Sequence, residues 1–166
     1  VDAVQGSGTI ELTSSIALSD QVTIDSGKTI ILDMNGETLS IGFSDSSKNL
    51  IVNNGTLTIT GDGTFDATEA TSYKGFINNY GTLTVENGTF QIADKAMTVH
   101  LRNQDGGKAV INGGTFSGGA TIVRSFEGSN TTITGGSFTN SVYPAVDVNG
   151  ETLITGGIFT NTSCSR

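Results

Sequence analysis

The side chains best suited to bind a ligand are polar and charged residues that fall in successive segments of the chain. One segment holds the single histidine together with Arg102, Gln104 and Asp105. Arginine and tyrosine are common anchors of recognition surfaces, and tyrosine with side-chain amides can hydrogen-bond sugar hydroxyls. If these segments are neighbouring strands with outward side chains, they form one polar stripe. The candidate ligand-binding residues are Asn78, Tyr80, His100, Arg102, Gln104, Arg124 and Asp147.

The same residues allow a second interpretation, a solvated face without a ligand. In that case Arg124 pairs with Asp147 or Glu127, which contributes little stability at an exposed site. His100 as a general base would need a nearby partner and a pKa matched to its task.

A repeat must position these side chains. Five segments end in a related pattern, in which residues 108–116 read K-A-V-I-N-G-G-T-F. Such recurrence at a nearly constant spacing is typical of solenoids, in which loop length varies while the strands stay in register. The terminal phenylalanines lie 25, 26, 22 and 21 residues apart, at Phe65, Phe90, Phe116, Phe138 and Phe159.

Alternation within each repeat predicts a strand with one buried face. The position of Ile111 is apolar in every repeat, and the position of Ala109 lies two residues earlier on the same face. Thr58, Thr84 and Val110 lie between them and should face water or a partner. The following Gly-Gly or Asn-Gly bends the chain. We expect the phenylalanine after it to return to the core and to stack on its counterparts.

A second strand precedes each repeat, and most of these strands end in an asparagine or another polar residue just before glycine. These asparagines either form a hydrogen-bonded ladder along the solenoid or serve as ordinary turn residues. The strands are expected at residues 50–54, 76–80, 97–104, 121–127 and 145–149.

The length of the repeat predicts how the chain winds. Equivalent residues recur once per 21–26 residues, which is one coil of about three short strands, so neighbouring strands run parallel. The sequence therefore predicts an all-β, right-handed, single-stranded parallel β-helix of about seven coils. Residues 1–166 form one domain in this prediction, and we expect this domain to be a module of a longer protein. N-terminal coils span 1–40 and regular repeats span 50–160, with protruding loops at 45–48 and 67–74.

Composition excludes several classes of protein. Eight basic and sixteen acidic residues give a net charge of −8, which disfavours nucleic acid as a partner. No apolar run approaches the roughly 20 residues of a membrane span, so we expect no membrane insertion. Cys164 is the only cysteine, and one cysteine with one histidine offers no zinc site. We expect neither a metal nor a cofactor.

Residues 10–39 resemble the opening of right-handed parallel β-helix domains of the pectate-lyase-like superfamily, which occur in bacterial surface proteins. The resemblance rests on Ser26-Gly27-Lys28-Thr29, on Leu32-Asp33-Met34-Asn35-Gly36-Glu37-Thr38-Leu39 and on the later G-G-T-F coils. It covers nearly the whole chain and implies the fold. It does not imply one activity, since the superfamily contains polysaccharide lyases, glycoside hydrolases, tailspikes and non-catalytic adhesins.

The positions of the carboxylates show whether the chain could be a lyase or a hydrolase of this superfamily. Lyase relatives use an acidic calcium-binding cluster and an arginine base, whereas hydrolase relatives use two or three converging aspartates. Either arrangement needs carboxylates on neighbouring coils. The aspartates fall singly or at turns, so we predict no catalytic residue: Asp33, Asp62, Asp66, Asp94, Asp105 and Asp147.

The expected function is a non-catalytic extracellular module of a bacterial surface protein, which binds a polysaccharide, a host-surface glycan or a host protein, or acts as a spacer. The alternative is a polysaccharide lyase or glycoside hydrolase of the same superfamily.

Overall fold

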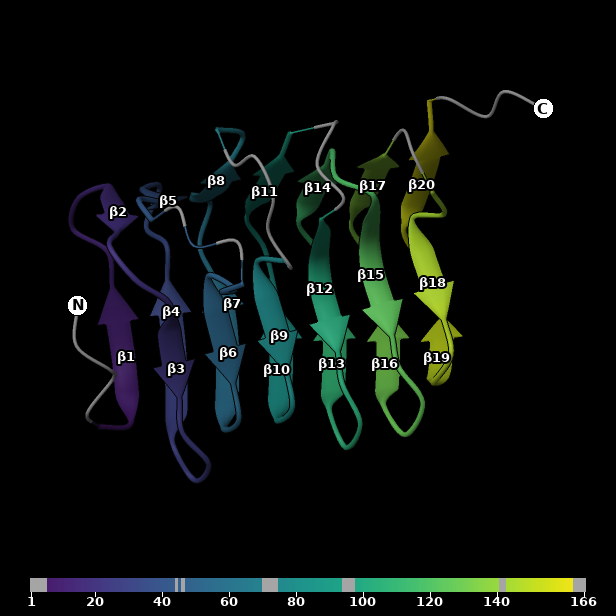
Figure 1. The fold of residues 1–166 in the computed structure, drawn as a ribbon, viewed down its shortest axis with the longest axis horizontal. Coiled ribbons are helices and arrows are strands. Elements are labelled where there is room, and N and C mark those ends of the chain that lie inside the picture. Colours follow the sequence, from purple (N-terminus) through teal and green to yellow (C-terminus); the bar gives the residue numbers. More distant parts are fainter. Residues whose placement is uncertain are drawn as a thin grey trace.

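The computed structural model describes residues 6–43, 45, 47–69, 75–93, 98–140 and 143–162, and within them it contains strands and no helix. The twenty strands form three parallel sheets (Figure 1). Sheet A contains β1 (Gly8–Glu11), β4 (Thr29–Asp33), β7 (Thr56–Thr60), β10 (Thr82–Val85), β13 (Lys108–Ile111), β16 (Asn130–Ile133) and β19 (Glu151–Ile154). Sheet B contains β2 (Ile16–Leu18), β5 (Thr38–Ile41), β8 (Thr64–Ala67), β11 (Thr89–Ile92), β14 (Thr115–Ser117), β17 (Ser137–Asn140) and β20 (Ile158–Asn161). Sheet C contains β3 (Val22–Ile24), β6 (Ile51–Asn53), β9 (Ile77–Asn79), β12 (Val99–Asn103), β15 (Thr121–Ser125) and β18 (Val146–Val148).

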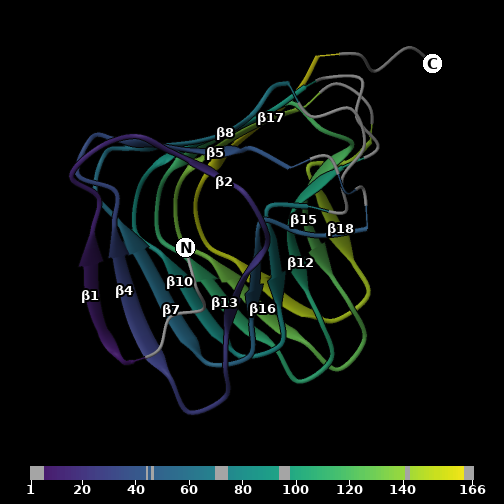
Figure 2. The ribbon, with the colours of Figure 1, turned by 60° about the vertical axis from the view of Figure 1, so that its left-hand side comes forward.

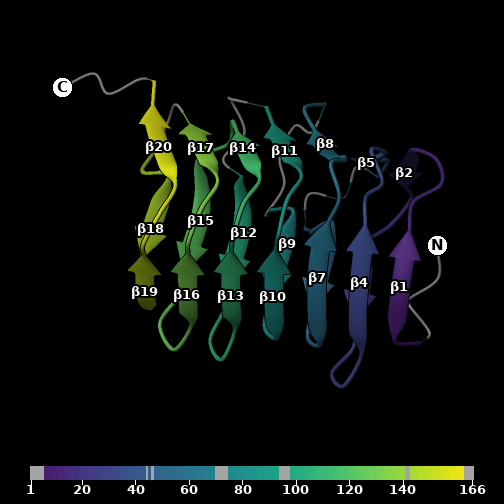
Figure 3. The same ribbon diagram turned by 180° about the vertical axis from the view of Figure 1, so that it is seen from behind.

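The chain visits sheets A, B and C in turn and then starts the next coil, so each strand from β1 to β17 pairs with the strand three places further along the chain. The three sheets surround one core (Figure 2), and the strands lie side by side from the N-terminal to the C-terminal end when seen from either side (Figures 1 and 3). The predicted parallel solenoid is confirmed. It has six complete coils and two strands of a seventh, slightly fewer than the seven predicted. No helix in the described part of the chain is long and apolar enough to cross a membrane.

Sheet A shows why the alternating pattern folds this way. Leu83 and Val85 of β10 lie beside Ala109 and Ile111 of β13, and these four side chains are at most 1% exposed. Val110 lies between them on the outer face, where it is only partly buried. The next residues turn the chain, and the second glycine of each pair has a positive φ, 97° at Gly114, which costs other residues steric strain.

The predicted phenylalanine stack is confirmed in sheet B. Neighbouring rings lie nearly parallel, with centroids 4.6, 4.5, 5.0 and 4.7 Å apart from Phe65 through Phe90, Phe116 and Phe138 to Phe159. Leu39 and Ile16 continue this column toward the N-terminal end. The rings therefore hold β8, β11, β14, β17 and β20 in one register.

A buried ladder of asparagines lines the end of sheet C, as the first of the two interpretations predicted. Asn53 Nδ2 donates to Asn79 Oδ1 at 2.7 Å, and Asn79 Nδ2 donates to Asn103 Oδ1 at 2.8 Å. Asn103 then donates to Thr131 Oγ1, which contacts Ser125 Oγ. The ladder satisfies side-chain amides that are fully buried.

Two expectations for the fold need correction. Ile154 and Phe159 follow the buried pattern but are 45% and 40% exposed, because no described strand covers the outer side of the last coil. Strand β2 at Ile16–Leu18 was not predicted, since three residues carry too little alternation to show a period. Several expected features lie outside the described residues: Asp94, Met97 at the start of a predicted strand, positions 70–74 of a predicted loop, and Cys164.

Candidate functional site

Four of the predicted ligand-binding residues form one column across sheet C. The register places Asn78 of β9 beside Arg102 of β12, Arg102 beside Arg124 of β15, and Arg124 beside Asp147 of β18. In β9, β12 and β15 these residues are partly buried while the residues on both sides of them are buried, so the column lies on the outer face of the sheet. Parallel strands about 4.8 Å apart make this column about 14 Å long.

Two further predicted residues extend the column sideways. Tyr80 and Gln104 directly follow β9 and β12, and their backbone amides continue the ladder of sheet C. Gln104 Nε2 donates to Asn78 Oδ1 at 2.6 Å, and Asn78 Nδ2 donates to the Tyr80 hydroxyl oxygen at 3.3 Å. Tyr80 is 48% exposed, so its ring is open to a partner. We call Asn78, Tyr80, Arg102, Gln104, Arg124 and Asp147 the sheet C stripe.

Arg124 has a carboxylate partner within the stripe. Its Nε donates to Asp147 Oδ2 at 2.7 Å, and its Cζ lies 5.9 Å from the centroid of the Phe126 ring. The pairing with Asp147 is one of those that the solvated-face interpretation predicted. Both side chains are about one-third exposed, at 36% and 34%, so solvent screens the pair and it contributes at most about 1 kcal/mol.

Arg102 differs from its neighbour. Its Nε is buried and has no hydrogen-bond partner among the described residues. Burial lowers the pKa of Arg102 most strongly, the adjacent charge of Arg124 lowers it further, and Tyr80 acts in the opposite direction. The middle of the stripe thus holds a partly desolvated cation with unused donors.

His100 is not part of the stripe, and its prediction as an outward residue was wrong. The side chain is 1% exposed and lies between the rings of Phe76 and Phe116, with centroids 5.5 and 6.0 Å away. Its Nε2 lies 3.1 Å from the carbonyl oxygen of Gly118, while Nδ1 has no partner among the described residues. Burial lowers the pKa of His100 to about 4, despite the backbone hydrogen bonds that favour the charged form.

The column of His100 explains its burial. The register places His100 beside Ile122 of β15 and beside Phe76, the residue directly before β9, and both of these are fully buried. This column lies near the start of the sheet C strands, where the chain arrives from sheet B. At this position the side chain points into the core. The two apolar neighbours in the repeat were the sequence signal for a core position.

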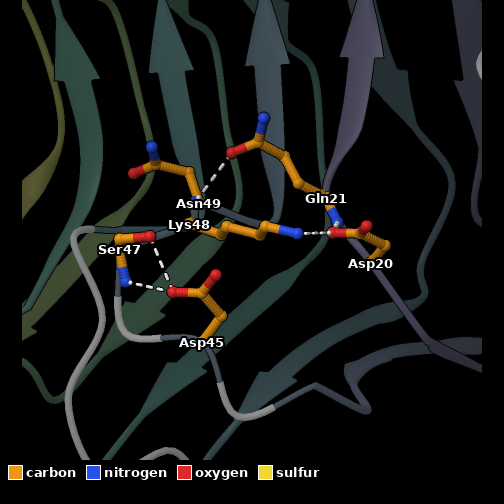
Figure 4. Close-up of polar contacts among 6 residues, drawn as sticks. All are labelled: Asp20, Gln21, Asp45, Ser47, Lys48 and Asn49. Atoms are coloured by element: carbon orange, nitrogen blue, oxygen red, sulfur yellow. Dashed lines mark hydrogen bonds and ion pairs between the residues drawn. The ribbon is translucent and has the colours of Figure 1, made fainter.

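Other polar clusters in the described residues do not converge into a catalytic or metal site. Lys48 Nζ lies 2.6 Å from Asp20 Oδ1, and Asp45 accepts hydrogen bonds from Ser47 (Figure 4). These contacts lower the pKa of both carboxyl groups, so they hold the ionised form. Within the described ranges, no group of three or more His, Cys, Asp or Glu side chains is placed to hold a metal ion.

Several carboxylates elsewhere have amide partners on the next coil. Asn87 donates to Asp62, Asn112 donates to Glu86, and Asn35 donates to Glu11. Such contacts link neighbouring turns of the solenoid. One pair of carboxylates does lie on neighbouring coils, since the register of sheet A places Glu11 of β1 beside Asp33 of β4. Asn35 donates to both of them, through Nδ2 to Glu11 and through its backbone N–H to Asp33. Comparison with protein-family models, with curated proteins and with solved structures finds no match to this chain.

Proposed function

We propose that the protein is a non-catalytic glycan-binding module, and that the sheet C stripe is its binding surface. The observation that carries this proposal is the alignment of Asn78, Arg102 and Arg124 across neighbouring strands, with the exposed ring of Tyr80 beside them. A repeating sugar chain can follow such a row, because a parallel sheet offers equivalent positions at a constant spacing.

The chemistry of the stripe suits sugar hydroxyls. Amides and the tyrosine hydroxyl both donate and accept, and Gln104, Asn78 and Tyr80 already form one connected network on the surface. Aromatic rings and arginines are enriched where protein surfaces bind partners. A nucleic acid fits poorly, because the chain carries a net charge of −8.

Two contacts support binding without catalysis. The only histidine is buried among aromatic rings, and its low pKa keeps it neutral near pH 7. Asp147, the carboxylate of the stripe, is occupied by Arg124 and lies at one end of the column. General acid–base catalysis of glycoside cleavage needs two carboxyl groups facing one bond.

Origin and location are part of the same proposal. The β-solenoid and the repeat resemble pectate-lyase-like modules of bacterial surface proteins, and we place this chain at the cell surface or outside the cell. A surface module of that kind can bind glycans as an adhesin does. If the stripe binds nothing, the solenoid is a spacer.

The test is a screen of polysaccharides and immobilised glycans for binding, with a parallel assay for their degradation. Binding that the double variant Arg102→Ala/Arg124→Ala abolishes supports the proposal. The matched control is Thr84→Ala/Thr132→Ala, which changes the outer face of sheet A and should leave binding intact. Unchanged affinity in the arginine variant contradicts the proposed surface, and degradation of a polysaccharide contradicts the non-catalytic function.

A further inference from the structure

Two arginines lie side by side in the stripe, although like charges on adjacent strands destabilise a sheet. Arg124 offsets this repulsion through Asp147, whereas no described carboxylate pairs with Arg102.

The polar side chains next to Arg102 bond to each other and not to its guanidinium group. Asn78 Oδ1 accepts from Gln104, and the Tyr80 hydroxyl oxygen accepts from Asn78. The Nε–H of Arg102 therefore stays unsatisfied in a buried position, which is costly for a charged donor. The side chain as a whole is only partly buried, so bound carboxylate or sulfate oxygens would accept from the two terminal nitrogens of the same guanidinium, a bidentate geometry that arginine favours.

We infer that Arg102 is the binding site for an oxyanion of the ligand, a carboxylate or a sulfate, so that the stripe selects acidic glycans. This inference rests on the proposed glycan-binding function and adds the chemical class of the sugar. Arg124 contributes to the positive potential beside the anion, and Gln104, Asn78 and Tyr80 lie where they can contact hydroxyls of the same sugar.

Electrostatics set the conditions for binding. The net charge of −8 repels an anion at long range, whereas Arg102 attracts it at contact. The Debye length is about 10 Å at 0.1 M salt. Screening therefore weakens the repulsion from distant carboxylates more than the attraction between Arg102 and an anion in contact with it. We therefore expect anion binding to persist at physiological ionic strength.

A direct test follows the side-chain Nε–Hε signals of the arginines by ¹⁵N NMR. The chain has three arginines, and Arg102→Lys identifies the signal of Arg102 by its loss. Titration with glucuronate and with sulfate should shift this signal in a saturable way, and the comparison of the two separates carboxylate from sulfate. Glucose and sodium chloride at matched concentrations should not. If neither oxyanion shifts the signal beyond chloride, the inference is wrong.

Binding of acidic and neutral glycans provides the second test. Arg102→Gln should weaken binding of a carboxylated or sulfated glycan by about tenfold or more. Arg102→Lys should weaken this binding less, because lysine keeps the positive charge but cannot form the bidentate hydrogen bonds of a guanidinium group. Lys108→Gln removes an exposed cation from sheet A as a matched control. Equal binding of neutral glycans, with no response of Arg102 to anions, contradicts the inference and leaves the glycan-binding function standing. A shift of Arg102 without binding of any polysaccharide confirms the anion site and contradicts that function.

Discussion

Arg102 lies directly beside Arg124 on adjacent strands, but of these two arginines only Arg124 forms an ion pair within the described residues. The difference comes from the neighbouring coils. The coil that follows Arg124 supplies Asp147, whereas the coil that precedes Arg102 supplies Asn78, whose amide oxygen already accepts from Gln104. A repeat with constant backbone geometry thus gives two equivalent arginines different chemical roles.

Replacement of Asp147 by Asn should increase the affinity of the stripe for anions. Arg124 would lose its carboxylate partner, and the two guanidinium groups would face solvent together. The free energy of unfolding should fall by no more than about 1 kcal/mol, because the ion pair is partly exposed. Calorimetric titration with an acidic oligosaccharide and urea denaturation measure the two effects. Weaker anion binding in Asp147→Asn would contradict the assignment of Arg102 as an anion site.

The stripe was largely predictable from the sequence because register in a solenoid follows from the repeat. Once Phe90 and Phe116 are placed in one column, Asn78, Arg102 and Arg124 fall on equivalent strands of the next sheet. Alternation counted from Arg102 predicts an outward His100, whereas the residue is buried. Alternation fails at the start of β12, where three consecutive residues are buried.

Other features could not be read from the pattern. The lack of a carboxylate partner at Arg102 depends on side-chain conformations in three coils, which spacing does not determine. Exposure of Phe159 depends on what covers the last coil and not on its own repeat, whose sequence matches that of the buried coils. Sequence periodicity thus predicts which side chains lie in one column along the solenoid. The contacts between side chains of different columns are seen only in the structure.

Stability should fall with acidification because His100 must stay neutral in the folded state. Its folded pKa is about 4 and the ordinary value is 6.5, so the unfolded chain binds the extra proton between these values. The stabilisation is fully present above pH 6.5 and is lost as the pH falls toward 4. We expect a loss of about 2 kcal/mol between pH 7 and pH 5.

Urea denaturation at the two pH values measures this loss. His100→Leu should show a smaller dependence over the same range, since the variant keeps an apolar side chain in a column that already contains Ile122. An identical pH dependence in the protein and the variant would show that another group titrates.

Removal of one member of the asparagine ladder should destabilise the solenoid. Asn79 accepts from Asn53, and its Nδ2 donates to Asn103 Oδ1 and lies within hydrogen-bond distance of two carbonyl oxygens, all in buried surroundings. Asn79→Ala leaves Asn103 Oδ1 without a donor and removes one of the two acceptors of Asn53 Nδ2, so it should lower the free energy of unfolding by at least about 2 kcal/mol. The neighbour Asn78 faces outward, and Asn78→Ala should cost about 0.5 kcal/mol or less. Thermal denaturation of both variants compares them, and equal shifts would mean that the ladder is not a source of stability.

The phenylalanine stack should contribute more in its middle than at its end. Phe116 is 2% exposed and contacts a ring on each side, whereas Phe159 is 40% exposed and contacts Phe138 on one side. Phe116→Ala should therefore cost about 3–5 kcal/mol, the usual range for a buried phenylalanine. Phe159→Ala should cost about 1 kcal/mol. Chemical denaturation gives both values, and a larger loss at Phe159 would contradict the observed order of burial.

A charge on the inner face of sheet A should unfold the protein, whereas the same charge one residue earlier should not. Ile111 is fully buried between Val85 and Ile133, so Ile111→Asp places a carboxylate where neither water nor a cation reaches it. Val110 lies on the outer face between Thr84 and Thr132, and Val110→Asp loses only about 1 kcal/mol through poorer strand propensity. Circular dichroism should show a cooperative thermal transition for Val110→Asp and no β-sheet signal for Ile111→Asp. A normal transition in Ile111→Asp would mean that the inner and outer faces of this strand are exchanged.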